Sequence, residues 1–101
     1  MRIEVLYVPG CPNYQPALES VKRVLASETV ADEVHGVRVT TEAEAKALLF
    51  PGSPTVRVNG KDVEPKPTAA SGLACRLYSN GKGIPPEDIV RAAVIEAKQK
   101  D

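Results

Sequence analysis

Cys11 and Cys75 are the cysteines of this sequence, and Cys11 stands where a thiol could be chemically useful. It follows a short apolar run that is broken at Pro9-Gly10, and it stands before residues with helical spacing. The unpaired N–H groups and the positive dipole end of a helix favour an anion, so a cysteine at the N-cap should ionise more easily. We therefore predict an activated thiolate at Cys11. The alternative is a small buried residue that ends a strand.

The elements that must position Cys11 follow from the hydrophobic periodicity. Arg2–Val8 is typical of a strand buried on both faces, and Pro12 suits the first position of the next helix. Pro16 would clash with a carbonyl inside a helix, so either the first turn is distorted or the regular helix begins nearer Pro16. The later elements are a strand at Val34–Val39, a helix from Glu42 to about Leu49 with a capping box, a strand at Thr55–Val58, a hairpin turn at Asn59–Gly60, an irregular segment at Val63–Ala70, a strand at Leu73–Tyr78 and a helix that opens at Pro85–Asp88.

This β-α-β-α-β-β-α order predicts a single α/β domain over residues 1–101. The opening strand–helix–strand unit requires a parallel pair of strands, and the hairpin adds antiparallel ones. We expect a three-layer sandwich in which a mixed four-stranded sheet is covered by helices.

Composition narrows the possible partners. The 13 basic and 13 acidic side chains cancel, so the charge favours neither nucleic acid nor an anionic membrane. The first residues make a poor signal peptide and no run is long enough to span a bilayer, which predicts a cytoplasmic protein with reduced cysteines. No Cys/His set has the spacing of a zinc site and no glycine loop could cradle phosphates, so we expect no cofactor.

The element order, a cysteine after the first strand, and Gly52-Ser53-Pro54-Thr55 before the third strand together resemble the thioredoxin/glutaredoxin superfamily. The resemblance implies a cis peptide bond at Pro54, which would lie against Cys11. It also implies that a partner's chain would be bound by Pro54, by the backbone around Ser53 and by Thr55, with Pro12 and Tyr14 beside the thiol. The alternative is an ordinary trans proline in a loop.

More narrowly, Gly10-Cys11-Pro12-Asn13, the segment 52–60 and Cys75-Arg76-Leu77-Tyr78 resemble a group of small bacterial thioredoxin-like proteins, sometimes called alkylmercury-lyase-like. The sequence departs from the superfamily in its chemistry. Tyr14 stands where a dithiol oxidoreductase has its second cysteine. Glutaredoxins hold glutathione with a lysine just before the cysteine and an acidic pair just after the last strand. This sequence has no such lysine, and its acidic pair Glu87-Asp88 comes later in the chain than that position.

Cys75 lies 75 − 11 = 64 residues after Cys11. In the family topology its strand pairs with the strand that follows Pro54, which allows both thiols on one side of the sheet. Cys75 could then resolve a mixed disulfide, or share a soft metal ion such as mercury(II) with Cys11. The alternative is a packed strand residue. Cleavage of an organomercurial would also need a proton donor, for which Asp62 and Asp88 are unconvincing candidates.

The remaining polar residues give weaker signals. The Tyr14 hydroxyl could hydrogen-bond the thiolate or a substrate, or the ring could be part of the core. His35 has no evident link to Cys11, so we expect it on the surface. Arg57 and Arg76 on adjacent strands could form a cationic rim or an ordinary solvated face.

Three functions are compatible with these patterns. The first is a thioredoxin-like protein with one activated thiol at Cys11, acting in thiol–disulfide exchange or as a monothiol carrier on protein or small-molecule thiols. The second is sequestration of a soft metal or organomercurial by Cys11 and Cys75. The third is a non-catalytic module for protein contacts.

Overall fold

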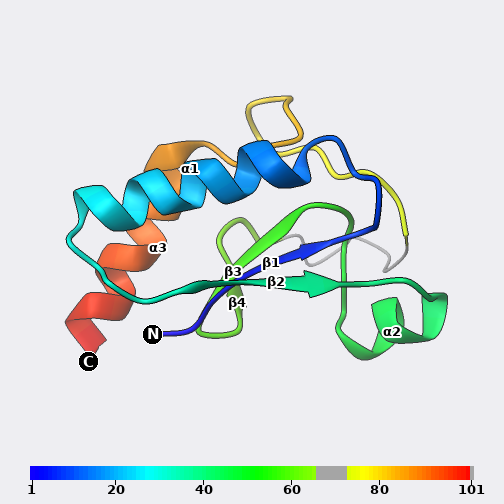
Figure 1. Ribbon diagram of the computed structural model, residues 1–101, viewed down its shortest axis with the longest axis horizontal. Coiled ribbons are helices and arrows are strands. Elements are labelled where there is room, and N and C mark those ends of the chain that lie inside the picture. The colour runs from blue at the N-terminus through cyan, green and yellow to red at the C-terminus, as the bar shows by residue number, and fades with distance from the viewer. Residues whose placement is uncertain (66–72, 101) are drawn as a thin grey trace.

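The computed structural model describes residues 1–65 and 73–100 (Figure 1). The part of the expected irregular segment Val63–Ala70 that begins at Lys66 lies outside the described residues. The elements are β1 (Ile3–Tyr7), α1 (Tyr14–Ser27), β2 (Val34–Arg38), α2 (Glu42–Ala47), β3 (Thr55–Val58), β4 (Lys61–Asp62) and α3 (Glu87–Lys100).

The sheet is mixed, with strand order β2-β1-β3-β4. β1 is central, because it pairs in parallel with β2 and antiparallel with β3. β4 pairs antiparallel with β3 at the edge of the sheet. The predicted α/β class and mixed four-stranded sheet are therefore confirmed, and the central strand ends where the Cys11 turn begins.

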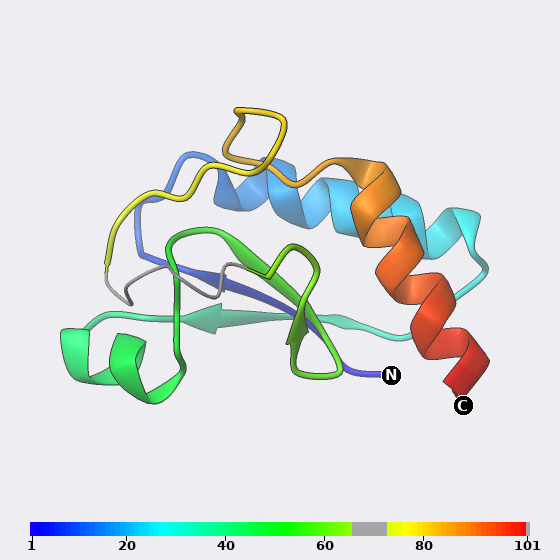
Figure 2. The same ribbon diagram turned by 180° about the vertical axis from the view of Figure 1, so that it is seen from behind.

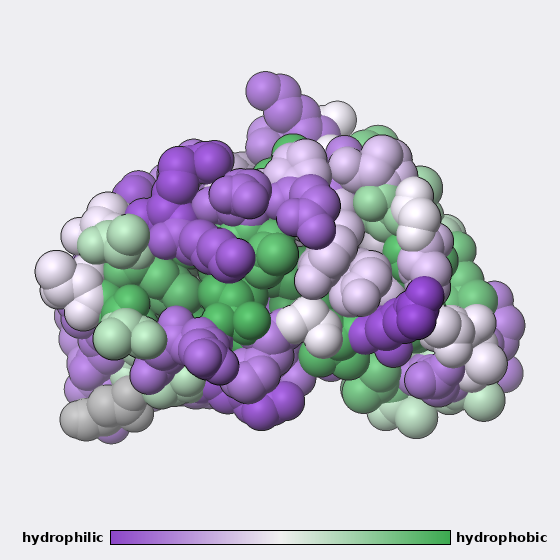
Figure 3. All heavy atoms as spheres, viewed as in Figure 1, coloured by the Kyte–Doolittle hydropathy of each residue, from purple (hydrophilic) through white to green (hydrophobic). Residues whose placement is uncertain are grey.

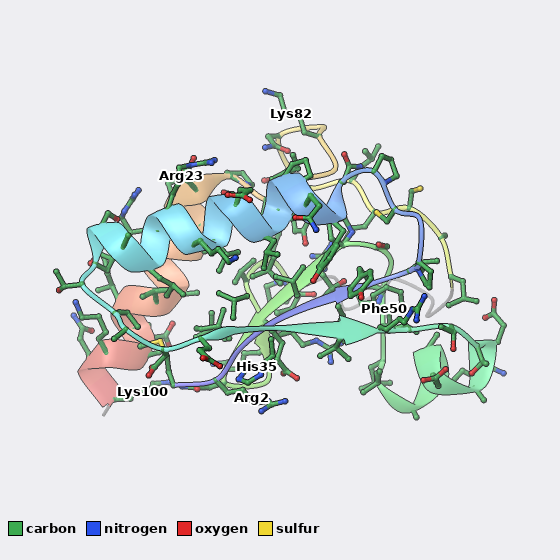
Figure 4. The ribbon with its side chains drawn as sticks, viewed as in Figure 1. Arg2, Arg23, His35, Phe50, Lys82 and Lys100 are labelled. Atoms are coloured by element: carbon green, nitrogen blue, oxygen red, sulfur yellow. The ribbon has the colours of Figure 1, made fainter. Side chains whose placement is uncertain are left out.

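Two hydrophobic clusters lie on opposite faces of the sheet. Successive strand residues point to opposite faces, so Ile3 and Val5 of β1 join one cluster and Leu6 joins the other. The larger cluster is formed with α1 and α3, which Figures 1 and 2 show side by side over one face. The smaller one contains Ala45 of α2 and the buried Phe50, which Figure 4 labels near the ends of β1 and β2, at the end of the molecule where α2 lies.

The outer surface of α1 is hydrophilic, whereas hydrophobic residues gather below it towards β2 (Figure 3). This arrangement is the amphipathic pattern that the spacing predicts. No helix in the described part of the chain has the length and apolar character needed to cross a membrane.

The hairpin turn and the capping box both form as predicted. Asn59 and Gly60 have φ values of 52° and 81°, the positive pair that a tight two-residue hairpin requires. At the start of α2, the backbone N–H of Glu44 donates to the hydroxyl of Thr41 at 3.1 Å. The Glu44 carboxylate in turn accepts from the backbone N–H of Thr40 at 3.3 Å.

The predicted strand at Leu73–Tyr78 is wrong. Among its residues, Cys75 alone forms a β-bridge, a parallel one with Ser53, and the fourth strand is Lys61–Asp62 instead. The tight Asn59–Gly60 turn explains the difference, because it brings Lys61 and Asp62 onto the free edge of β3 first. The later segment reaches the sheet only where β3 has not yet begun, at Ser53.

Candidate functional site

Cys11 is the junction of two consecutive turns. Its backbone N–H donates to the carbonyl of Val8 at 3.1 Å, and Gly10 supplies the positive φ of 83° that this turn needs. Its own carbonyl accepts from the N–H of Tyr14 at 3.3 Å across a second turn. The backbone of Cys11 is thus fixed on both sides, and the residue is partly exposed.

The predicted N-cap position of Cys11 is wrong. The N-cap is Asn13, with φ −93° and ψ −4°, and α1 begins at Tyr14 rather than at Pro12. Pro16 falls in the first helical turn, where its missing N–H would have no intrahelical partner, so it is accommodated without breaking the helix. Because Pro16 offers no N–H, the first turn presents fewer donors to an anion than the sequence suggested.

Tyr14 packs between α1 and the sheet. Its ring stacks on Tyr7 of β1, with the ring centroids 3.7 Å apart and an interplanar angle of 14°. Its hydroxyl lies over Gly36 of β2, where any Cβ would overlap it. Burial, and to a smaller extent the neighbouring Tyr7, raise the pKa of Tyr14. Tyr14 therefore holds the start of α1 on the sheet, and a glycine at position 36 makes room for it.

The loop before β3 is attached to the Cys11 turn through Ser53. The peptide bond between Ser53 and Pro54 is cis, as the resemblance implied. The backbone N–H of Val8 donates to Ser53 Oγ at 3.1 Å, and the carbonyl of the same Val8 accepts from Cys11. Ser53, Pro54 and Thr55 are all buried. The cis-proline loop and the cysteine turn are consequently parts of one hydrogen-bonded unit.

The backbone of Ser53 is already paired with the chain's own residues. Its N–H donates to the carbonyl of Ala74 at 2.8 Å, and its carbonyl accepts from the N–H of Arg76 at 3.0 Å. The expectation that this backbone binds a partner's chain is thus modified, because segment 74–76 occupies both groups. An incoming chain would have to contact the exposed neighbours instead, among them Pro12 and Cys75.

Cys75 lies in the middle of the segment that pairs with Ser53, and it is exposed. The alternative interpretation of Cys75, a packed strand residue, is therefore wrong. The two cysteines are free and flank the same serine, Cys11 through Val8 and Cys75 through the bridge. Figures 1 and 2 show segment 73–78 running past the turn that follows β1.

Arg76 of this segment forms a buried charged pair with Asp62, which sequence reasoning missed. Arg76 is 2% exposed and donates to both carboxylate oxygens of Asp62, at 2.6 Å and 3.0 Å. Arg76 therefore takes part in neither a cationic rim nor a solvated face, the two possibilities that the sequence left open. Arg57 donates instead to the carbonyls of Leu48 and Leu49 at the end of α2. Both oxygens of the Asp62 carboxylate thus already accept hydrogen bonds from Arg76.

Tyr78 completes the link to the cis-proline. Its hydroxyl donates to the carbonyl of Pro54 at 2.6 Å, and the Arg76 guanidinium lies 4.2 Å from its ring centroid. Burial raises the pKa of Tyr78, and the nearby Arg76 opposes that shift less strongly. The hydroxyl therefore stays protonated and can keep donating to Pro54.

Other candidate groups lie apart from the thiols. His35 is exposed, as expected, and Figure 4 shows it beside Arg2, away from the turn that follows β1. Asp88 is an exposed residue in the first turn of α3. Within residues 1–65 and 73–100, no group of three or more His, Cys, Asp and Glu side chains could hold a metal ion.

Comparisons with protein-family models, with curated proteins and with solved structures give no match. The features that bear on function are the two free thiols, the cis-proline loop and the buried Arg76–Asp62 pair.

Proposed function

We propose that this chain is a thioredoxin-like protein whose Cys11 thiol carries out thiol–disulfide exchange. The observation that carries the proposal is the junction at Ser53, the residue before the cis-proline. Ser53 is hydrogen-bonded to the Cys11 turn on one side and to the Cys75 segment on the other. Further support comes from the partial exposure of Cys11 and from its position between a central strand and a helix. A reactive thiol needs access together with a nearby positive dipole end, and α1 begins three residues after Cys11.

The exchange reaction would proceed in two steps. The Cys11 thiolate attacks one sulfur of a substrate disulfide, forms a mixed disulfide and releases the first substrate thiolate. The Cys75 thiolate then attacks the Cys11 sulfur, forms a Cys11–Cys75 disulfide and releases the second substrate thiolate. Two electrons pass from the protein to the substrate disulfide, and the protein thiols lose two protons overall. If an external thiol resolves the mixed disulfide instead, Cys11 acts as a monothiol carrier.

Cys75 replaces the second cysteine that Tyr14 does not provide. A Cys-x-x-Cys resolving thiol would sit in the first turn of α1, but that position is used to stack Tyr14 on Tyr7. Cys75 reaches the same junction from the other side, through its bridge to Ser53. We propose a cytoplasmic location for this chemistry, since that compartment keeps thiols reduced between turnovers.

Trapping the mixed disulfide tests the proposal. Wild type, Cys11→Ser and Cys75→Ser are each exposed to glutathione disulfide at neutral pH, and intact masses are recorded with time. Wild type should form the internal disulfide, Cys75→Ser should accumulate the glutathione adduct on Cys11, and Cys11→Ser should react much more slowly. Equal adduct formation on Cys11→Ser and Cys75→Ser would contradict a special role for Cys11.

Soft-metal binding is the second candidate, and it is favoured by the same placement of two free, accessible thiols around Ser53. Soft thiolate ligands select soft metals, and two of them are enough for mercury(II). Titration with mercury(II) should then give a one-to-one complex that disappears when either cysteine is replaced by serine. Binding that survives both single replacements would contradict this candidate.

A further inference from the structure

Arg76 is held by more contacts than a surface arginine would need. Besides the two bonds to Asp62, it donates to Thr55 Oγ1 at 3.1 Å and to the backbone carbonyl of Glu64. Its side chain is 1% exposed and that of Asp62 is 14% exposed. The guanidinium therefore ties together β3, the β4 edge and the segment that contains Cys75.

Stability alone is a weak explanation for this pair. Removing two charges from water offsets much of their attraction, and well-packed apolar residues often serve equally well in such places. The Nε of Arg76 is also buried without a hydrogen-bond partner in the described part of the chain, which adds a further unfavourable contribution. What the two parallel N–H···O bonds supply is a defined orientation, because a guanidinium and a carboxylate fit each other in few geometries.

That orientation determines where Cys75 points. Neighbouring residues of an extended segment project to opposite sides. Arg76 and Tyr78 are buried, whereas Cys75 and Leu77 are exposed. Inside, Arg76 bonds Asp62 while the Tyr78 hydroxyl donates to Pro54. With these two anchors facing inward, Cys75 is directed outward next to the cis-proline loop.

We propose that Arg76 and Asp62 are positioning residues, which keep the segment 74–76 on Ser53 and thereby hold Cys75 ready to react with a mixed disulfide on Cys11. The claim that Cys75 reacts at Cys11 rests on the proposed function. The claim that the ion pair keeps segment 74–76 on Ser53 does not, because the two hydrogen bonds of Ser53 to Ala74 and Arg76 can be measured directly.

The test uses the double substitution Asp62→Leu with Arg76→Met, which removes both charges and keeps apolar bulk in their place. Amide hydrogen exchange is followed at positions 53 and 76, with Val5 of the central strand as internal reference. We expect exchange about tenfold faster or more at both positions, and no comparable change at Val5. Unchanged protection at 53 and 76 in the folded variant would overturn the proposal. Arg57→Met removes another arginine that bonds backbone carbonyls and should leave both positions protected.

A measurement of the disulfide equilibrium then tests the positioning of Cys75 separately from the ordering of segment 74–76. The equilibrium constant for the Cys11–Cys75 disulfide against glutathione should fall about tenfold or more in the double variant, because the effective concentration of the two thiols falls. Arg76→Lys, which keeps the charge without the paired donors, should lie between wild type and the double variant. Loosened amides with an unchanged constant would overturn the positioning of Cys75. Failure of wild type to form this disulfide would contradict the proposed role of Cys75, while amide exchange would still decide whether the pair orders the segment.

Discussion

Ser53 is the residue on which the geometry of the site depends most. Its hydroxyl accepts from Val8, its N–H donates to Ala74 and its carbonyl accepts from Arg76. The side chain, the backbone N–H and the carbonyl of this one residue therefore join the cysteine turn to the segment of the second cysteine. The cis peptide bond that follows adds Pro54, whose carbonyl is bound by Tyr78.

Replacing Ser53 by alanine should destabilise the protein and loosen the Cys11 turn. The partly buried N–H of Val8 would lose its acceptor, and an unsatisfied buried donor costs about 1–3 kcal/mol. Urea unfolding of Ser53→Ala measures this loss, with the exposed Ser79→Ala as control, which should stay within about 0.5 kcal/mol of wild type. A Ser53→Ala protein as stable as Ser79→Ala would show that the Val8 bond contributes nothing.

The substitution Asp62→Asn should be far more harmful than the double substitution Asp62→Leu with Arg76→Met. It leaves the buried Arg76 charge without a counter-charge, which typically costs about 3–5 kcal/mol, whereas an apolar replacement of both partners is often neutral. Measuring the free energies of unfolding of the two variants shows which of them is the more destabilised. The reverse order would mean that the surrounding residues cannot accept apolar side chains.

At the scale of elements, α2 shows how a local signal sets a boundary. Thr41 caps the helix, and the Glu44 carboxylate accepts from the hydroxyls of Thr40 and Thr41. These bonds lower the pKa of Glu44 below its usual 4.5, and the bond from the Thr40 hydroxyl contributes most to this shift. The unfolded chain therefore binds a proton at Glu44 more readily than the folded one does.

The sign of the resulting pH dependence follows from this shift. The contribution of Glu44 is fully present above its ordinary pKa of 4.5 and is lost as pH falls through its lowered pKa in the folded protein. Wild type should thus exceed Glu44→Gln in urea midpoint at neutral pH, and the gap should close in strong acid. Glu42→Gln, in the same helical turn, is the control. A gap that widens on acidification would contradict this prediction.

Elements with local signals could be predicted from the sequence, and those that depend on distant residues could not. Thr41 with Glu44 and Asn59 with Gly60 are short-range patterns, and both formed as expected. Arg76 meets an aspartate 14 residues earlier, a pairing that no local pattern announces. The strand expected at Leu73–Tyr78 failed for the same reason, since the residues after the hairpin had already taken the edge of β3.

At the scale of the whole molecule, the site lies at the end of β1, the strand that contributes residues to both hydrophobic clusters. The cluster of α1 and α3 lies on one face of the sheet and the cluster of α2 on the other, and alternate residues of β1 contribute to each. The Cys11 turn leaves β1 directly and the Ser53 loop leads into β3, its partner. Rigidity of the central pair of strands therefore fixes how the turn and the loop approach each other.

Leu6→Ala should test this dependence on the core. Leu6 is 1% exposed in the smaller cluster, and truncating such a leucine costs about 2–5 kcal/mol. Leu49→Ala is the matched control, because Leu49 is 78% exposed and its truncation should change stability by about 0.5 kcal/mol at most. Equal unfolding midpoints for the two variants would show that the smaller cluster does not stabilise the fold.

The reactivity of the Cys11 thiol tests the central claim most directly. The rate of alkylation by iodoacetamide is measured across pH in Cys75→Ser, where Cys11 is the remaining thiol, with Cys11→Ser reporting Cys75 in the same way. A reactive thiol at Cys11 predicts that Cys11 is alkylated faster than Cys75 at neutral pH. Alkylation of Cys11 no faster than that of Cys75 would contradict the proposed function and leave Cys11 as a structural cysteine.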